Sequence, residues 1–398
     1  MKTIKAFAVS LLLCALTLVG LHLWCGRGLS ADGKAGTWVS DAKSQSGSTL
    51  KKMAADENAL LIFGSSELRH GQGSGFHGDT IFDGADMDPI YVGKAGYQSL
   101  THAITLGAVG SQAANKKAVL IVSPQWFKEN GVKSTAFEAA FSEEEYIALL
   151  ENPDISQETK DYINGRLQNI MADNENMSER VKKAREWYQP KDDNTAEQQG
   201  WLEQKKADFH KILLEEKNNY KVMTEALMDG ISNDKSRESG AKLSQATWKQ
   251  LRKEAETEGH KLSDGNDYGM FDSVYKGTYQ TLIANGKHKN PKYTLDSMEF
   301  SDLECFLSIC REEGIEPLVV ILPFNGYWYD YTELTAEERS AFYEKIRCIA
   351  EDYGVQCADL SGNEYTEYYF EDNSHPALKG LVDLNEAIYE FYRKDKTE

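Results

Sequence analysis

The sequence predicts an α/β fold in three layers, α/β/α, with a parallel central sheet, a large helical insertion and one membrane-spanning helix in front. Uninterrupted apolar runs of strand length stand at 60–63, 118–122 and 317–322. Their lack of polar alternation is typical of parallel strands covered on both faces. A long charged stretch with helical spacing, 137–290, separates the later two runs, and an uncharged segment, 6–25, lies near the amino terminus.

The amino-terminal segment has the composition of a membrane anchor. Residues 6–25 carry no Asp, Glu, Lys or Arg, and about 20 apolar residues suffice to cross a hydrocarbon core. A cleaved signal peptide is the alternative, but its apolar core is usually shorter and followed by small residues, whereas Leu23, Trp24 and Cys25 are bulky. The lysines within residues 1–5 predict a cytoplasmic amino terminus. We therefore expect a single-pass protein of the cell membrane with an extracytoplasmic carboxyl-terminal domain.

The part of the chain outside the anchor is acidic. Mean hydropathy is −0.54 and the formal net charge is −19; without the anchor, which holds two lysines and no acidic residue, it becomes −21. Such a domain is repelled by nucleic acid and by anionic membrane surfaces. The composition therefore excludes nucleic acid as a partner, and any polyanionic substrate would need a local basic rim.

Four of the six cysteines lie outside the anchor, at 305, 310, 348 and 357. Cys305 and Cys310 share one predicted helix at a spacing that does not stack them, so Cys348 and Cys357 form the only disulfide worth testing. No pair has zinc-finger spacing with histidines nearby, and no metal site is predicted.

The elements after the anchor follow in a regular order. Residues 26–50, rich in Gly, Ser and charge, predict a flexible or partly ordered linker. The α/β domain is expected over 51–136 and 291–398, with the helical insertion at 137–290 between them. Further strands are predicted at 89–92 and 355–360, and helices at 98–106, 300–313, 336–353 and 377–393. Alternating units of this kind imply right-handed crossovers.

Two apolar stripes occur in the insertion. Each is interpreted as a packing face. The first stripe comprises Trp201, Phe209, Ile212, Leu213, Tyr220 and Leu227, and the second Trp248, Leu251 and Ala255.

A serine follows the first predicted strand. The run that ends at Phe63 is followed by Gly64, Ser65 and Ser66, and glycine permits a sharp exit at the carboxyl edge of the sheet, where ligands of open α/β sheets collect. An ordinary polar turn is the alternative. A serine hydroxyl is a weak nucleophile without a base, so a functional role requires a histidine elsewhere.

A histidine with an acid three residues before it stands near the carboxyl terminus, at Asp372 and His375. A carboxylate on Nδ1 would leave Nε2 of His375 free as general base toward Ser66, and the chain order Ser, Asp, His is a permitted order for this triad. Asp330 or Glu67 could replace Asp372 as the orienting acid, although contiguity favours Asp372.

An early serine after the first strand and a late D-x-x-H resemble the SGNH, or GDSL-type, hydrolase superfamily, which implies a flavodoxin-like sheet. A narrower resemblance, over about residues 1 to 395, is to the DltD family of D-alanyl-lipoteichoic acid biosynthesis. It is carried in order by four strings: Gly64-Ser65-Ser66-Glu67-Leu68, Ser123-Pro124-Gln125-Trp126-Phe127, the stretch from Leu322 to Thr332, and Asp372-Asn373-Ser374-His375.

The resemblance implies further site residues. Oxyanion donors are expected from the backbone N–H groups of Ser66 and of the glycine turn at Gly96, and from Gln125, which stands where SGNH enzymes usually have asparagine. The substrate-groove candidates are Glu67, Arg69, His70, Asn325, Trp328 and Lys379, with Lys94 as a further member of a basic rim.

The function that the resemblance implies is D-alanyl transfer to lipoteichoic acid. Ser66 would accept the D-alanyl group as an ester from a membrane acyltransferase, with D-alanyl carrier protein as a further partner, and a hydroxyl of the polymer would then attack. This chemistry requires no metal or nucleotide cofactor. The alternatives are an SGNH-type esterase or thioesterase that hydrolyses D-alanyl esters or thioesters, and a non-catalytic docking protein of the alanylation machinery.

Overall fold

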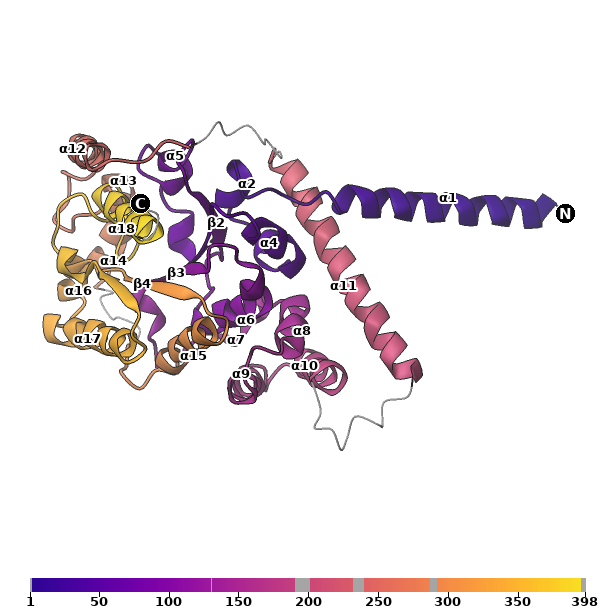
Figure 1. Cartoon of the computed structure of the whole chain (residues 1–398). Coiled ribbons are helices and arrows are strands. Elements are labelled where there is room, and N and C mark those ends of the chain that lie inside the picture. Colours follow the sequence, from indigo (N-terminus) through magenta and orange to yellow (C-terminus); the bar gives the residue numbers. More distant parts are fainter. Residues whose placement is uncertain (1, 130, 190–200, 232–239, 287–291, 395–398) are drawn as a thin grey trace.

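A computed structural model describes residues 2–129, 131–189, 201–231, 240–286 and 292–394. Its centre is a parallel sheet of five strands in the order β2-β1-β3-β4-β5, and Figure 1 shows helices packed around it. The strands are β1 (Ala59–Phe63), β2 (Asp88–Val92), β3 (Lys117–Val122), β4 (Glu316–Ile321) and β5 (Gln356–Asp359). The predicted parallel α/β architecture is confirmed.

The side chains of the strands alternate between two separate cores, as the period of a strand requires. Leu61, Phe63 and Leu120 belong to one core, and Leu60 and Ile62 to the other. The first core is covered by α4 (Gly47–Ala54), α6 (Ser99–Val109), α15 (Glu299–Glu312) and α17 (Ala336–Asp352), and the second by α5 (Gly78–Ile81), α12 (Gln245–Leu262) and α18 (Lys379–Arg393). Both faces are buried, which explains the uninterrupted apolar runs.

The turns after β1 and β2 approach each other closely. A Cβ atom at Gly93 would lie 1.9 Å from the carbonyl oxygen of Gly64, and Gly93 has a φ of 126°. Only glycine satisfies both conditions. This contact holds the exit of β1, and therefore the serine turn, against its neighbour.

Residues 26–50, for which the composition predicted a flexible or partly ordered linker, contain short helices that pack against the body. They contain α2 (Lys34–Thr37), α3 (Asp41–Ser44) and the start of α4. Ala35, Trp38 and Lys43 are buried, and the Lys43 ammonium donates to the carbonyl oxygens of Ala35 (3.0 Å) and Gly36 (2.6 Å). The small side chains of Gly, Ser and Ala allow this segment to pack closely against the body. The same residues are also common in flexible segments, so composition alone cannot tell the two cases apart.

The region 137–290 is helical where the structure describes it. Its elements, beginning with a helix that starts just before it, are α7 (Ser134–Ala140), α8 (Glu143–Glu151), α9 (Gln157–Ile170), α10 (Glu175–Tyr188), α11 (Trp201–Met228), α12, α13 (Asp272–Val274), a π-helical turn (Tyr275–Tyr279) and α14 (Gln280–Ala284). A buried ion pair joins Arg166 of α9 to Asp302 of α15 at 2.8 Å, so these helices pack directly against the α/β body.

The two predicted apolar stripes have different outcomes. Trp248 and Ala255 of α12 are buried, and Leu251 packs against the same core. The stripe on α11, in contrast, is exposed, with Phe209 60% and Leu227 70% accessible. Its interpretation as a packing face was wrong.

The amino-terminal helix α1 (Lys2–Cys25) projects away from the body (Figure 1). Residues Ile4–Cys25 have a mean hydropathy of 2.3, and the helix is long and apolar enough to cross a membrane. No comparable helix occurs elsewhere among the described residues. Cys348 and Cys357 are both free thiols, so the disulfide considered from the sequence is not formed.

Candidate active site

Ser66 stands at the carboxyl edge of the sheet. The chain leaves β1 at Phe63, passes Gly64 and Ser65, and begins a short 3₁₀ helix, η1 (Ser66–Leu68), with Ser66 as its first residue. The first N–H groups of a helix have no partner within that helix. The Ser66 side chain is half-buried and its backbone N–H lies at a helix start, a position suited to hold a developing negative charge.

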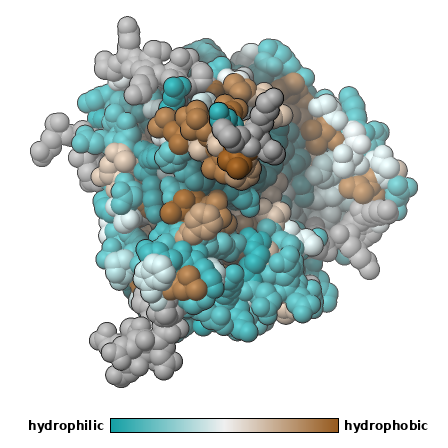
Figure 2. Space-filling view, turned by 90° about the vertical axis from the view of Figure 1, so that its right-hand side faces the viewer, coloured by the Kyte–Doolittle hydropathy of each residue, from teal (hydrophilic) through white to brown (hydrophobic). Residues whose placement is uncertain are grey.

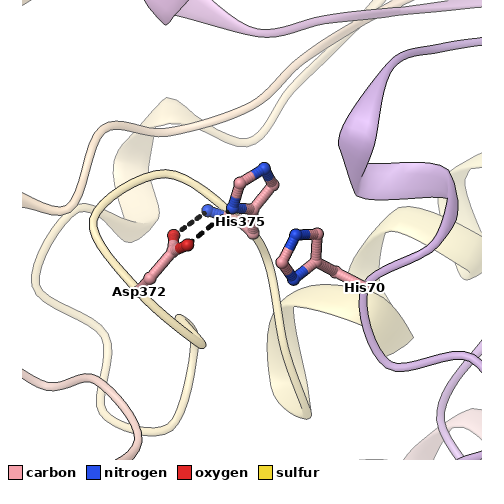
Figure 3. Close-up of side chains that lie close together, drawn as sticks. All are labelled: His70, Asp372 and His375. Atoms are coloured by element: carbon pink, nitrogen blue, oxygen red, sulfur yellow. Dashed lines mark hydrogen bonds and ion pairs between the residues drawn. The ribbon is translucent and has the colours of Figure 1, made fainter. Parts of the chain in front are cut away.

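Asp372 accepts three hydrogen bonds in the loop before α18, and two of them join it to His375. Asp372 Oδ1 accepts from the backbone N–H groups of Ser374 (2.8 Å) and His375 (2.9 Å), and its Oδ2 lies 2.7 Å from His375 Nδ1 (Figure 3). The carboxylate thus stabilises the loop that contains it and also orients the imidazole. The three-residue spacing between Asp372 and His375 makes these local hydrogen bonds possible.

His375, near the carboxyl-terminal end of the chain, lies next to Ser66. His375 Nε2 lies 2.7 Å from Ser66 Oγ, although the two residues are 309 positions apart. If Nδ1 carries the ring proton and donates a hydrogen bond to Asp372, Nε2 is left as an acceptor for the Ser66 hydroxyl. The three predicted residues are therefore brought together in the order of a Ser-His-Asp arrangement.

Burial and charge act in opposite directions on this pair. Burial favours the neutral form of His375, but the hydrogen bond and charge of Asp372 outweigh it and raise the pKa of the imidazole. Burial also favours a neutral Asp372, yet hydrogen bonds from His375 and the backbone prevail and lower the pKa of the carboxyl. Asp372 therefore stays ionised and stabilises a positive charge on the ring.

His70 lies against the other side of the histidine. Its ring stacks on that of His375 (Figure 3), with centroids 3.7 Å apart and planes 12° apart. Its Nδ1 is 3.0 Å from Glu371 Oε2. His70, Asp372 and His375 each place a ligand atom within 4.8 Å of the others. Parallel rings, however, direct their nitrogen lone pairs along parallel planes rather than toward one point. Both nitrogens of His375 are also already engaged, so the geometry fits a stacked support better than an ion site.

Glu67 is buried beneath the serine turn. One carboxyl oxygen accepts the N–H of Ser65 at 2.5 Å, and the other has no hydrogen-bond partner among the described residues. Burial raises the pKa of this carboxyl. Glu67 thus shapes the turn rather than orienting His375, and Asp330, the other alternative acid, pairs with Arg339 instead.

The three oxyanion candidates have different surroundings. Ser66 has the helix-start N–H described above. The N–H of Gly96 donates to Ser65 Oγ at 3.2 Å, so this donor supports the neighbouring serine. Gln125, in the short helix η3 (Pro124–Trp126), is half-buried and has no hydrogen bond to Ser66, Asp372 or His375.

The groove candidates divide into buried and accessible side chains. Asn325 caps α16 (Gly326–Tyr331) and donates to the carbonyl oxygens of Tyr268 (2.9 Å) and Asp372 (3.2 Å), and both Asn325 and Trp328 are buried. Neither side chain is open to a ligand. The accessible candidates are Arg69, which is exposed, His70, which is half-buried, and Lys379, which lies 3.9 Å from Glu256.

Two tyrosines also reach the loop that carries Asp372 and His375. Tyr279, from the helical insertion, donates to Asn373 Oδ1 at 2.8 Å, and the Tyr329 hydroxyl accepts from the Asn373 side chain at 3.3 Å. Tyr279 belongs to no motif, and only the long-range packing of the insertion against this loop identifies it. Tyr329 lies within the stretch from Leu322 to Thr332 that carries the family resemblance.

Comparison with known proteins gives one consistent family. The profile described as DltD protein matches residues 36–393. Protein DltD of Bacillus subtilis is 32% identical over 352 residues, covering 87% of this chain and 85% of the relative. Protein DltD of Staphylococcus aureus is 27% identical over 336 residues, with 82% and 79% covered, and that of Lacticaseibacillus rhamnosus is 25% identical over 409, with 97% and 89% covered. The chain belongs to the DltD family.

Proposed function

We propose that the protein transfers D-alanyl groups to lipoteichoic acid through Ser66, as a serine-dependent acyltransferase. Membership in a family of D-alanyl-lipoteichoic acid biosynthesis supports a role in D-alanylation. The observation that carries the chemistry is the hydrogen-bonded series Ser66, His375, Asp372, with both inter-residue distances at 2.7 Å. A serine in such a series is an activated nucleophile.

The reaction divides into two half-reactions. Ser66 Oγ attacks the carbonyl carbon of a D-alanyl donor while its proton passes to His375 Nε2; the resulting oxyanion faces the N–H of Ser66. The intermediate collapses, His375 returns the proton to the leaving group, and a D-alanyl ester of Ser66 remains. A hydroxyl of the polymer then gives its proton to His375 and attacks this ester. Collapse breaks the ester bond to Ser66, His375 returns the proton to Ser66 Oγ, and the D-alanyl group is left on the acceptor.

Two partners supply and receive the group in this proposal. The donor is held by a membrane acyltransferase of the same pathway, charged from D-alanyl carrier protein, and the acceptor is lipoteichoic acid. The proposed anchor α1 would keep Ser66 on the outer side of the cell membrane, where the polymer is. Preference for a hydroxyl over water requires positioning of the acceptor and exclusion of water.

The test is the D-alanine ester content of lipoteichoic acid in cells whose sole copy is wild type, Ser66→Ala or His375→Ala. Ser111→Ala is a matched control, since Ser111 is exposed in the turn before β3, at the opposite edge of the sheet. Membrane levels are equalised by immunoblot. We expect ester loss in the first two variants only. Full ester content in Ser66→Ala would refute the catalytic proposal and leave a docking role.

A purified system separates transfer from hydrolysis. The full chain, in detergent or vesicles, is given a D-alanyl thioester with and without glycerol-phosphate polymer. Transfer predicts a Ser66-dependent ester on the polymer; release of free D-alanine at the same rate in both mixtures would identify a hydrolase instead.

A further inference from the structure

The exposed apolar side chains of the body are concentrated on one helix. Outside α1, the described part of the chain exposes eleven large apolar residues, and eight of them belong to α11. Their spacing places most of them along one side of the helix. The members of this exposed stripe are Trp201, Leu202, Phe209, Ile212, Leu213, Tyr220, Leu227 and Met228.

The other side of α11 is already held by the body. Ala207, Val222 and Ala226 are buried. Asn219 Oδ1 accepts from Ser48 Oγ at 2.7 Å, and Asn218 donates to Glu144 at 2.7 Å. The stripe is therefore not a misplaced core face, because the helix has a separate packing face. An apolar surface of this extent on a fixed helix indicates a contact with something outside the described chain.

The stripe lies next to the point where α1 leaves the body. The rings of Trp24 and Tyr220 meet edge to face with centroids 6.4 Å apart, and His22 Nδ1 lies 2.6 Å from Glu216 Oε1. Figure 1 shows α1 projecting from the side of the body that α11 crosses, and Figure 2, which faces that side, shows apolar patches on it. A membrane crossed by α1 would therefore face α11.

We propose that α11 lies in the outer interface of the membrane, with its exposed stripe among the acyl chains and headgroups. This inference rests on the proposed membrane span of α1 and not on the chemistry of Ser66. Trp201 and Tyr220 are residue types that favour the interface, and a helix with one apolar and one polar side binds in the plane of the membrane.

Charge favours the lipid surface at this helix over the rest of the body. The chain as a whole carries −19, whereas α11 has five lysines and five acidic residues and is formally neutral. It can approach an anionic bilayer without the repulsion that the remaining surface meets. Contact at α1 and at α11 would hold the α/β body in one orientation above the membrane.

The test uses the full chain reconstituted without any partner protein in vesicles of phosphatidylcholine and phosphatidylglycerol. The exposed thiols Cys14 and Cys348 are replaced by serine, and a nitroxide is attached at Phe209→Cys. Lys221→Cys, an exposed position outside the stripe on the same helix, is the matched control, and Leu12→Cys reports on α1. Collisions with oxygen, which dissolves in lipid, are compared with collisions with a water-soluble nickel chelate.

We expect the oxygen-to-nickel ratio to be above one at Phe209→Cys and Leu12→Cys and below one at Lys221→Cys. A ratio below one at Phe209→Cys, with Leu12→Cys in lipid, would overturn the inference and point to a partner protein as the occupant. Shielding from both reagents would also overturn it, in favour of a second copy. A ratio below one at Leu12→Cys would refute the membrane span and the inference together. Ser66 takes no part in these readings, so they are separate from the test of the proposed function.

Discussion

In the proposed mechanism, His375 must be neutral to accept the proton of Ser66, and Asp372 raises the pKa of its imidazole. In Asp372→Asn we expect the rate of acyl transfer to fall by about 10³- to 10⁴-fold, because the correct tautomer and the stabilising charge are both lost. Loss of the negative charge also lowers the pKa of His375, so the acidic limb of the residual pH–rate profile should move to lower pH.

The measurement is kcat/KM for acyl transfer against pH in wild type and Asp372→Asn, with Ser111→Ala as control. An acidic limb that stays in place, or moves to higher pH, would show that Asp372 does not set the protonation of the base.

The ring of His70 stacks on the imidazole of His375, which is the base of the proposed mechanism, and supports its plane. Aromatic pairs contribute about 0.5–1.5 kcal/mol, so His70→Ala is expected to lower kcat about 2- to 10-fold with little change in KM. His70→Phe keeps a ring without a titratable group and should restore most of kcat. Equal losses in the two variants would assign the role to the nitrogen atoms and their contact with Glu371.

The residues of the site differ in how far the sequence could predict them. Asp372 and His375 are three positions apart, so local geometry decides their contact, and the structure brings them together. Glu67 was an alternative acid only because its surroundings were unknown; its bond to Ser65 depends on the shape of the turn. Asn325 follows a strand as expected, but its side chain turns inward to hold the Asp372 loop. No sequence pattern predicts that the Asn325 side chain points into the protein.

At the scale of elements, the turn after β2 places the strictest requirement on residue type, because it needs a glycine at position 93. Gly93→Ala places a Cβ atom on the Gly64 carbonyl and imposes a positive φ on alanine. We expect a loss of about 3 kcal/mol or more in the free energy of unfolding. Gly73→Ala, with a φ of 77° but open space around it, should cost about 1 kcal/mol.

Thermal or denaturant unfolding of the two glycine variants measures this difference. Because both positions have positive φ, the excess loss at Gly93→Ala isolates the close approach. Equal losses would show that the serine turn can move away from β2 without cost.

The strands were predictable because burial on both faces leaves only apolar residues in them, and each observed strand lies within two residues of its predicted ends. The close packing of the segment 26–50 and the exposure of the stripe on α11 were not predictable from the sequence. Glycine, serine and alanine are frequent both in mobile segments and where backbones pack closely, and Ala35 is fully buried. An amphipathic helix reveals that one side is apolar but not whether protein or lipid covers it.

At the scale of the whole molecule, charge opposes a polyanionic acceptor. The chain carries −19, and the basic-rim candidates Lys94 and Lys379 lie 2.6 Å and 3.9 Å from Asp41 and Glu256. Raising ionic strength from about 0.01 M to about 0.15 M shortens the screening length from about 30 Å to about 8 Å. Transfer to glycerol-phosphate polymer should therefore become faster over this range.

Initial rates with the polymer and with uncharged glycerol as acceptors test this expectation, since only the polymer should respond to salt. A rate that falls with added salt would reveal a positively charged path to Ser66.

The serine and histidine that meet at the sheet edge lie 309 residues apart in the chain. During synthesis, Ser66 is therefore made long before His375. A truncated copy that ends before residue 375 has the serine but not the imidazole that lies within hydrogen-bond distance of it. Under the proposed mechanism such a copy could not consume activated D-alanine, so the proposed reactivity would begin only after His375 has been made.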